Sequence, residues 1–235
     1  MKMSKKVALV TGVGPGTGSS IARCFCKGGY KVAMIARDKE RLKSLEDELE
    51  NSKGYSCELR NPEYLNSTID NIIKDFGYPD VFIHNAVRGT RGNFLEFTPE
   101  ELQSNFDINV IALHRIAQKV TPEMIKKGKG AIIVTGNTSA HRGKANFGGT
   151  ASTKAAQKIL TESFARYLNP KGVHVAYITI DAAIDLEWTR KAWPDKPDDF
   201  FIKPDDIASE VWHIVHQSKS AWTFDHWLRP FGENW

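Results

Sequence analysis

The chain has 235 residues, a mass of 26.3 kDa and a net charge of +4, from 32 Lys plus Arg and 28 Asp plus Glu. No stretch approaches the roughly 18 uninterrupted apolar residues of a membrane-spanning helix, and the start of the chain lacks the apolar core of a signal peptide. The charges are dispersed without blocks of like sign, so these features predict a cytoplasmic protein with no membrane or nucleic-acid partner.

Short apolar runs alternate with longer amphipathic segments along the chain. Continuous, β-branched runs are typical of buried parallel strands, and they lie at about 7–10, 32–35, 81–83, 131–134 and 173–178. Helical periodicity lies at about 19–28, 39–51, 62–76, 98–127, 151–169 and 205–217. This alternation, without a linker, predicts a single α/β domain over residues 1–235, a doubly wound parallel sheet with helices on both faces.

The periodicity disappears between residues 186 and 204, where aromatic side chains lie among prolines. A long aromatic loop after a strand predicts a lid or a wall of a substrate site. A hydrophobic loop packed at a subunit contact is the alternative interpretation.

The first predicted strand runs into a glycine-rich turn that opens directly into a helix. Glycine permits the tight turn and the close approach of a pyrophosphate, and the helix N-terminus supplies free N–H groups and a positive dipole end. Because the turn lies inside a strand–helix–strand unit, we expect it to bind a dinucleotide. The expected contacts are Gly12, Gly14, Pro15, Gly16 and Gly18.

The spacing Thr11-Gly12-x-x-x-Gly16-x-Gly18 resembles that of the short-chain dehydrogenase/reductase family. Other family segments match in the same order, from about residue 5 to residue 185: Ala36-Arg37-Asp38 after the second strand, Cys57-Glu58-Leu59 at the end of the third, His84-Asn85-Ala86-Val87 at the end of the fourth, Asn109-Val110, and Thr150 to Ala156. The family usually reads Asn-Asn-Ala-Gly where this chain has His84-Asn85-Ala86-Val87. The resemblance implies a Rossmann-like fold and hydride transfer between a nicotinamide and a carbonyl or alcohol carbon. It also implies cofactor contacts from Glu58, Leu59, Asn85, Ala86, Lys154 and Ile184.

The residues after the second strand bear on the choice of dinucleotide. An acidic side chain there hydrogen-bonds the ribose 2′-hydroxyl and would repel a 2′-phosphate, but here Arg37 precedes Asp38. Guanidinium pairs well with phosphate, and in the family arginine at this place is associated with NADP. We therefore predict NADP rather than NAD. In the alternative interpretation, Arg37 is solvated and Asp38 is a helix N-cap.

The resemblance implies four catalytic positions, of which this chain changes two. Lys154 matches the lysine, and Asn109 matches the asparagine that orders a proton-relay water in the family. Thr150 stands where the family has its acid tyrosine, and Asn137 stands where it has a serine. A threonine hydroxyl is far less acidic than a phenol, so threonine cannot replace tyrosine as a general acid. Thr150 can hold a water, and the Asn137 amide can polarise a substrate oxygen.

Nearby groups are further candidates to compensate for the missing acid. A small shift at the strand end would present Thr138 or Ser139, and His141 could titrate near neutrality. A solvent-facing loop is the alternative for His141. Tyr167 and Tyr177 are interpreted as core aromatics.

Metal binding is not expected. Cys24, Cys26 and Cys57 are too few for a disulfide framework, and we interpret them as reduced thiols. His213 and His216 have helical spacing, but we interpret them as one face of an amphipathic helix.

Two functional hypotheses follow. The first is an NADP-dependent oxidoreductase with an altered proton-donor site and a small-molecule substrate. The second is a catalytically silent dinucleotide-binding protein that acts through binding or assembly. The resemblance also implies a homodimer or homotetramer packed through the helices at about 98–127 and 151–169.

Overall fold

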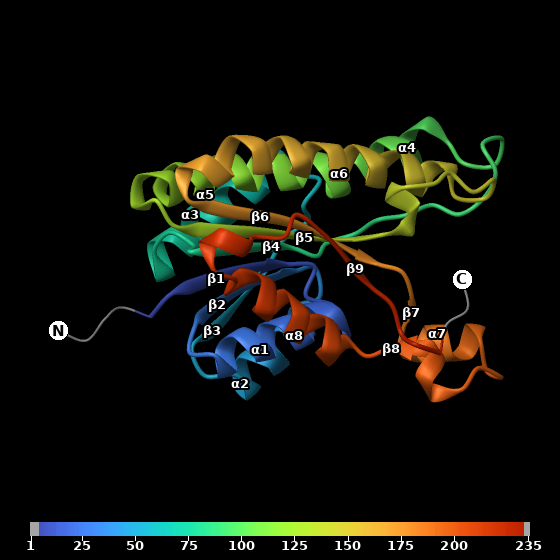
Figure 1. Cartoon of the computed structure of the whole chain (residues 1–235), viewed down its shortest axis with the longest axis horizontal. Helices are drawn as coiled ribbons and strands as arrows, with labels where there is room; N and C mark the ends of the chain where they lie inside the picture. Colours follow the sequence, from blue (N-terminus) through green and yellow to red (C-terminus); the bar gives the residue numbers. More distant parts are fainter. Residues whose placement is uncertain (1–4, 233–235) are drawn as a thin grey trace.

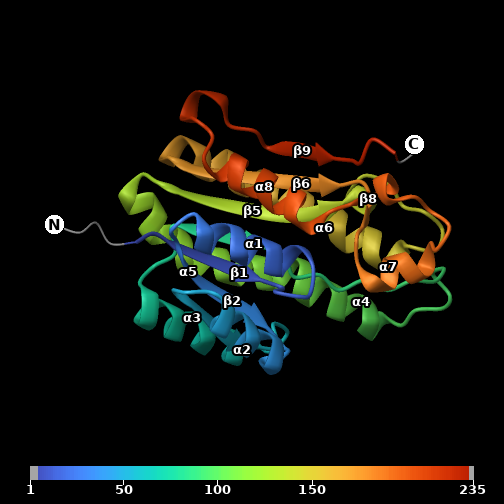
Figure 2. The same ribbon diagram turned by 90° about the horizontal axis from the view of Figure 1, so that it is seen from below.

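The computed structural model describes residues 5–232 and contains a seven-stranded parallel sheet in the order β3-β2-β1-β4-β5-β6-β9 (Figures 1 and 2). The strands are β1 (Val7–Thr11), β2 (Lys31–Ala36), β3 (Ser52–Ser56), β4 (Val81–His84), β5 (Gly130–Asn137), β6 (Val173–Ile180) and β9 (Asp225–Leu228). β1 pairs with β2 on one side and with β4 on the other, so the strand order reverses beside β1. In open α/β sheets, a ligand crevice lies at the carboxyl ends of the strands at such a point.

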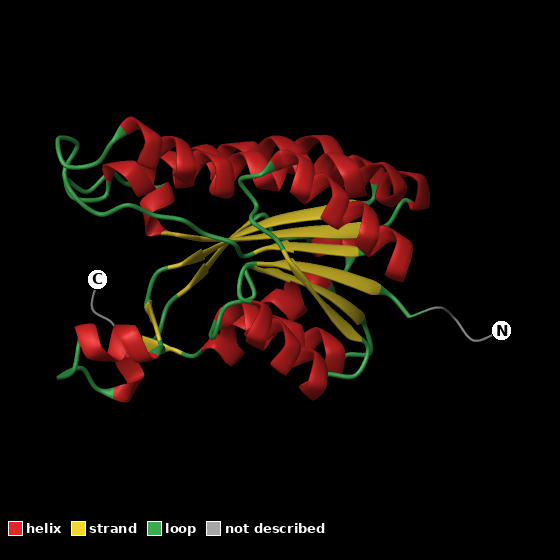
Figure 3. Ribbon diagram, turned by 180° about the vertical axis from the view of Figure 1, so that it is seen from behind, coloured by secondary structure: helices red, strands yellow, loops and turns green. Residues whose placement is uncertain are grey.

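Helices cover both faces of this sheet, which confirms the predicted doubly wound fold (Figure 3). On one face lie α3 (Pro62–Phe76), α4 (Pro99–Phe106), α5 (Ala112–Lys127) and α6 (Gly148–Leu168). On the other lie α1 (Thr17–Lys27), α2 (Lys39–Glu48) and α8 (Pro204–Val215). Alternate strand residues point to the two faces, and each face has its own buried apolar core.

The helix expected over 98–127 is interrupted. Thr98 and Glu101 form a reciprocal capping box at the start of α4. The π-helical turn η1 (Asp107–Ile111) then separates α4 from α5. A π turn accommodates an extra residue and occurs frequently at functional sites, and Asn109 lies inside this one.

Both edges of the sheet differ from the expectation. β3 ends at Ser56, so the segment Cys57-Glu58-Leu59 follows the strand instead of ending it. β9 was not predicted, because its sequence Asp-His-Trp-Leu has only four residues, two polar followed by two apolar, and so lacks a continuous apolar run.

The stretch at 186–204 was predicted as a loop, and it contains short regular elements. These are α7 (Glu187–Ala192), the 3-10 turn η4 (Asp198–Phe200) and β8 (Phe201–Ile202), and β8 pairs in parallel with β7 (Ala183–Ile184). They lie beside the main sheet near the carboxyl ends of its strands (Figure 3). Elements of two to six residues are too short to show a periodicity, so the apolar pattern does not predict them.

Candidate cofactor and catalytic site

The glycine-rich turn between β1 and α1 requires glycine at two positions. Gly12 has φ +71°, and a Cβ there would lie 2.5 Å from the Ala86 backbone. A Cβ on Gly18 would lie 2.3 Å from the Gly12 carbonyl oxygen. Gly14 N–H donates to that same oxygen at 2.8 Å. The predicted turn therefore packs against the segment after β4 at Gly12 and against its own backbone at Gly18, with no room for a side chain at either position.

The start of α1 offers groups that fit a pyrophosphate. Gly16 and Thr17 are buried there, while Pro15 is exposed. No side-chain cap satisfies the start of α1, and the Thr17 Oγ1 is buried without a hydrogen-bond partner within residues 5–232. Leu186 packs over Gly16, since a Cβ on that glycine would lie 2.5 Å from its Cδ2. Free donors at a helix N-terminus next to a glycine cradle suit an anionic dinucleotide.

Polar side chains at the end of β4 connect the turn to the neighbouring strands. Asn85 Nδ2 donates to the Gly12 carbonyl oxygen at 2.8 Å, and Thr135 Oγ1 donates to Asn85 Oδ1 at 2.9 Å. The fully buried His84 contacts Thr11 Oγ1 through Nδ1 at 3.1 Å and the Ile108 carbonyl oxygen through Nε2 at 3.1 Å. Because a carbonyl oxygen only accepts, Nε2 carries the proton. Burial, and then the nearby Lys154 charge, lower the pKa of His84 to about 3, so it is neutral.

The residues after β2 separate into two roles. The Asp38 side chain accepts from the Arg41 N–H at 3.0 Å and caps α2. Arg37 is exposed at the carboxyl end of β2. Burial raises the pKa of Glu58, but hydrogen bonds from Arg60 and the charge of Arg37 hold it below its usual value. The N-cap interpretation of Asp38 is thus confirmed, and Arg37 lies exposed to solvent near Glu58.

Two other predicted cofactor residues lie in different surroundings. Leu59 is buried in the core on the α3–α6 face. Ile184 is half-buried in β7, in register with Ile202.

Thr150 lies in the first turn of α6, and its hydroxyl is already engaged. It accepts from the Thr90 N–H at 3.0 Å and donates to the Thr90 carbonyl oxygen at 3.0 Å. Gly89 lies against it, because a Cβ there would be 2.7 Å from the hydroxyl oxygen. The hydroxyl therefore fastens the loop after β4 to α6.

Lys154 is 2% exposed and belongs to the same helix as Thr150. Its Nζ donates to the Thr135 carbonyl oxygen at 3.2 Å and to the Gln157 Oε1 at 2.8 Å. Burial lowers its pKa to about 7. Asn109 is also buried, and its side chain holds both the N–H and the carbonyl of Arg88, at 3.0 and 2.8 Å.

The end of β5 places the remaining candidates. Asn137 Oδ1 accepts from the Ser139 N–H at 3.1 Å. His141 contacts Thr179 Oγ1 at 3.0 Å and stacks on Trp227, with ring centroids 4.5 Å apart. Its pKa is lowered, first by burial, so its ring is neutral near pH 7. The His141 residue is exposed, and its ring packs against Thr179 of β6 and Trp227 of β9.

The two tyrosines differ from each other. Tyr177 is fully buried, with its hydroxyl packed over Gly136 and without a hydrogen-bond partner in the described part of the chain. Its core assignment is confirmed. Tyr167 is 62% exposed, with Lys171 Nζ 3.3 Å from its ring centroid, so its core assignment is wrong. It lies near the end of α6, on the side that faces away from the sheet.

Gln157, which the sequence analysis missed, connects two of the predicted residues. It is fully buried, and its Nε2 donates to the Asn109 carbonyl oxygen at 2.6 Å while its Oε1 accepts from Lys154. Its position three residues after Lys154 was a usable signal, because such residues share a helix face.

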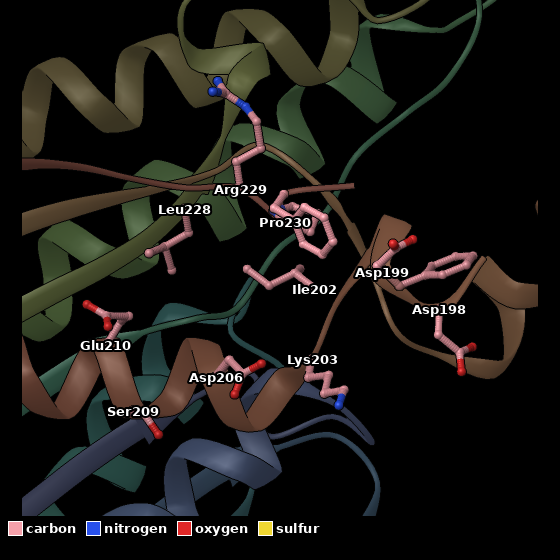
Figure 4. A pocket seen from close by; sticks show the side chains of 12 residues that line it. Asp198, Asp199, Ile202, Lys203, Asp206, Ser209, Glu210, Leu228, Arg229 and Pro230 are labelled. Carbon is pink, nitrogen blue, oxygen red and sulfur yellow. The ribbon is translucent and has the colours of Figure 1, made fainter. Parts of the chain in front are cut away.

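A separate pocket of about 650 Å³ opens beside α8, and Figure 4 shows its lining. Four carboxylates and two cations line it: Asp198, Asp199, Asp206, Glu210, Lys203 and Arg229. Its apolar residues Ile202 and Leu228 belong to the core on the α1–α8 face. None of the residues predicted for the cofactor or for catalysis lines this pocket.

The expected features outside the site can also be placed. His216 contacts the Tyr30 hydroxyl at 3.1 Å and packs on Trp212, and the three cysteines are free. Within residues 5–232, there is no cluster of three or more metal-ligating side chains, and no helix is long and apolar enough to cross a membrane.

The arrangement is that of a dinucleotide-binding α/β protein, and comparison with known proteins specifies the family. The short chain dehydrogenase family matches residues 6–192 of the chain. A 3-oxoacyl-(acyl-carrier-protein) reductase of Vibrio cholerae is 33% identical over 177 residues, covering 74% of this chain and 72% of its own. An uncharacterized oxidoreductase of Staphylococcus aureus (strain USA300) is 27% identical over 233 residues, covering 97% and 98%.

Solved structures agree. An alcohol dehydrogenase from the archaeon Thermococcus sibiricus, complexed with 5-hydroxy-NADP, is similar with a TM-score of 0.84 and 26% identity, over 98% of each chain. The chain belongs to the short-chain dehydrogenase family. It is an NAD(P)-dependent oxidoreductase with the Rossmann-like fold of that family.

Proposed function

We propose that this chain is an NADP-dependent oxidoreductase that transfers hydride between the nicotinamide and a carbonyl or alcohol substrate, with an altered proton-donor site. The observation that carries the proposal is the glycine cradle against Ala86, combined with an exposed Arg37 at the carboxyl end of β2. The cradle fits a pyrophosphate, and Arg37 offers a guanidinium to a 2′-phosphate. Asp38 does not oppose it, because its carboxylate caps α2.

When bound, NADPH supplies the hydride, and the side chains of the chain bind and orient. Lys154 holds the nicotinamide ribose with its remaining N–H. Asn137 polarises the substrate oxygen through Nδ2, since Ser139 N–H already holds its Oδ1. Asn109 supports the loop after β4 through Arg88.

The contacts of Thr150 support the altered proton-donor site. Its proton points to the Thr90 carbonyl oxygen, so it is not offered to a substrate. Thr150 is therefore a positioning residue for the loop after β4, and the proton reaches the substrate oxygen from another group or from solvent.

The segment 186–204 forms a wall of the substrate site in this proposal. Leu186 lies over Gly16, and Trp188 in α7 is 58% exposed. The whole chain is one domain, and it assembles as a homodimer or homotetramer through the helices at about 98–127 (α4 and α5) and 151–169 (α6). Ile159 and Tyr167 on α6 support this assembly, because they are 63% and 62% exposed.

A panel of aldehydes, ketones and alcohols, assayed with NADPH and NADP at several pH values, tests the function. We expect turnover of at least one substrate with NADP(H). Tight NADPH binding, measured by calorimetry, without turnover of any substrate would instead support a silent dinucleotide-binding protein. Light scattering over a concentration series tests the assembly, and a monomer at all concentrations would contradict it.

A further inference from the structure

Gln157 forms a fixed bridge inside the site. Its Nε2 donates to the Asn109 carbonyl oxygen at 2.6 Å, and its Oε1 accepts from Lys154 Nζ at 2.8 Å. A carbonyl oxygen only accepts and an ammonium only donates, so the amide has one orientation that satisfies both partners. A flipped amide would leave a buried donor facing the ammonium, which is costly.

The π turn η1 explains why the Asn109 carbonyl is available to this bridge. A widened turn disturbs the regular backbone ladder of a helix. Two consecutive carbonyl oxygens of η1 accept side-chain hydrogen bonds, Ile108 from His84 and Asn109 from Gln157. Gln157 therefore connects α6 to the irregular part of the neighbouring helix.

Among residues 5–232, the bridge leaves Lys154 one unused hydrogen-bonding direction. An ammonium has three N–H donors, and two of them point to the Thr135 carbonyl oxygen and to Gln157 Oε1. In the neutral amine, both N–H groups can stay on these acceptors while a lone pair takes the third direction. Thr135 Oγ1 continues the network to Asn85, and Asn85 continues it to Gly12. The network thus ends at the glycine cradle.

We propose that Gln157 is a positioning residue that, through its bridge to Asn109, holds Lys154 with one free direction for the cofactor ribose and sets the pH range in which this direction offers a donor. The proposal rests on the proposed cofactor function. It makes NADPH affinity depend on the protonation of Lys154, with Gln157 as the group that determines where this change occurs.

The surroundings of Lys154 support such a titration. His84 on β4 is neutral, and Tyr177 on β6 stays protonated because burial raises its pKa. From β5 the contact is the uncharged Thr135 carbonyl oxygen, and η1 is joined to Lys154 through Gln157. The Asp107 carboxylate of η1 accepts from Gln103 at 2.8 Å. Arg88 is a cation of the loop after β4, and Asn109 holds its backbone N–H and carbonyl. Burial lowers the Lys154 pKa to about 7.

The protonation of Lys154 can be followed by NMR in the cofactor-free protein, with lysines labelled with carbon-13 at Cε. Loss of one signal in Lys154→Met assigns the resonance. Gln157→Glu places a carboxylate beside the ammonium and should raise the Lys154 pKa by about one unit or more. Gln157→Met keeps the length, removes the acceptor and should lower it. If Gln157→Met does not fold, the direction in which Gln157→Glu shifts the Lys154 pKa tests the proposal by itself.

NADPH affinity, measured by calorimetry between pH 6 and 9, gives the second measurement. We expect affinity to fall about fivefold as Lys154 loses its proton, because a charge-assisted hydrogen bond becomes a neutral one. In Gln157→Glu this fall should move to higher pH.

Thr161→Val is the matched control. Thr161 is equally buried on α6, and its hydroxyl donates to the Gln157 carbonyl oxygen of its own helix at 2.7 Å. It should change stability but leave the Lys154 pKa unaltered. An unchanged Lys154 pKa in folded Gln157→Glu would overturn the proposal. If the wild type binds no NADPH while Gln157→Glu still shifts the Lys154 pKa, the proposed function is overturned instead.

Discussion

The turn after β1 and the first turns of α6 lie in one site, but their side chains are constrained in opposite ways. At the turn, packing excludes side chains, since Gly12 and Gly18 each meet backbone atoms closer than 3 Å from a Cβ position. At α6, the polar side chains are buried and hydrogen-bonded, with Thr150 on Thr90 and Lys154 on Gln157. Backbone geometry thus maintains the glycine turn, whereas buried side-chain hydrogen bonds maintain the α6 network. We expect an added side chain to disrupt the glycine turn by steric clash, and a change in the protonation of Lys154 to alter the α6 network.

The largest effect should come from the buried amine of the α6 network. Between pH 7 and 10, the unfolded chain, with a lysine pKa near 10.4, keeps a proton that folded Lys154 has released, so the free energy of unfolding rises with pH. Below about pH 7 both states bind the proton and this slope vanishes. Relative to Lys154→Met, wild-type stability should rise by on the order of 3–4 kcal/mol over this range. Urea unfolding at a series of pH values measures it, and parallel curves for the two proteins would contradict it.

The cradle should respond to one added methyl group. We expect Gly12→Ala to lower the free energy of unfolding by about 3 kcal/mol, because its φ is +71° and the new Cβ would meet Ala86 at 2.5 Å. Gly14→Ala is the control, since its nearest atom would be 4.0 Å away. Thermal and urea unfolding compare the two variants. Equal destabilisation of both variants would show that the close contact with Ala86 is not the cause of the loss of stability.

The cradle was predictable from sequence and the α6 network was not, for a physical reason. Gly12 to Gly18 form a local pattern, because turn and helix start are consecutive in the chain. The bridge from Gln157 to Asn109 joins residues 48 positions apart, and it depends on a π turn that leaves no mark in the apolar periodicity. The short elements α7 and β8 were missed for a different reason, because six and two residues are too few to show a periodicity.

Cofactor choice tests the solvent-facing side of the cradle. Arg37→Leu should remove most of the preference for NADPH over NADH, a loss of about 1.5–3 kcal/mol or ten- to a hundredfold in affinity. Arg41→Leu is the matched control, because Arg41 pairs with the Asp38 carboxylate at 2.9 Å and should not touch the phosphate. Calorimetry with both cofactors measures the preference. Equal affinities in the wild type would refute the role of Arg37.

The smallest effect should come from the Thr150 hydroxyl. Thr150→Val keeps the shape and removes both hydrogen bonds to Thr90, which is half-buried, so water can replace part of them. We expect a loss of about 1 kcal/mol in stability. NADPH affinity and turnover of any accepted substrate should stay within about threefold, since the hydroxyl fastens a loop and gives no proton. Loss of turnover by a hundredfold, with folding and NADPH binding intact, would show that Thr150 takes part in the chemistry. In that event, the role of α6 would go beyond holding side chains in place, because α6 would supply a reacting group as well as a binding group.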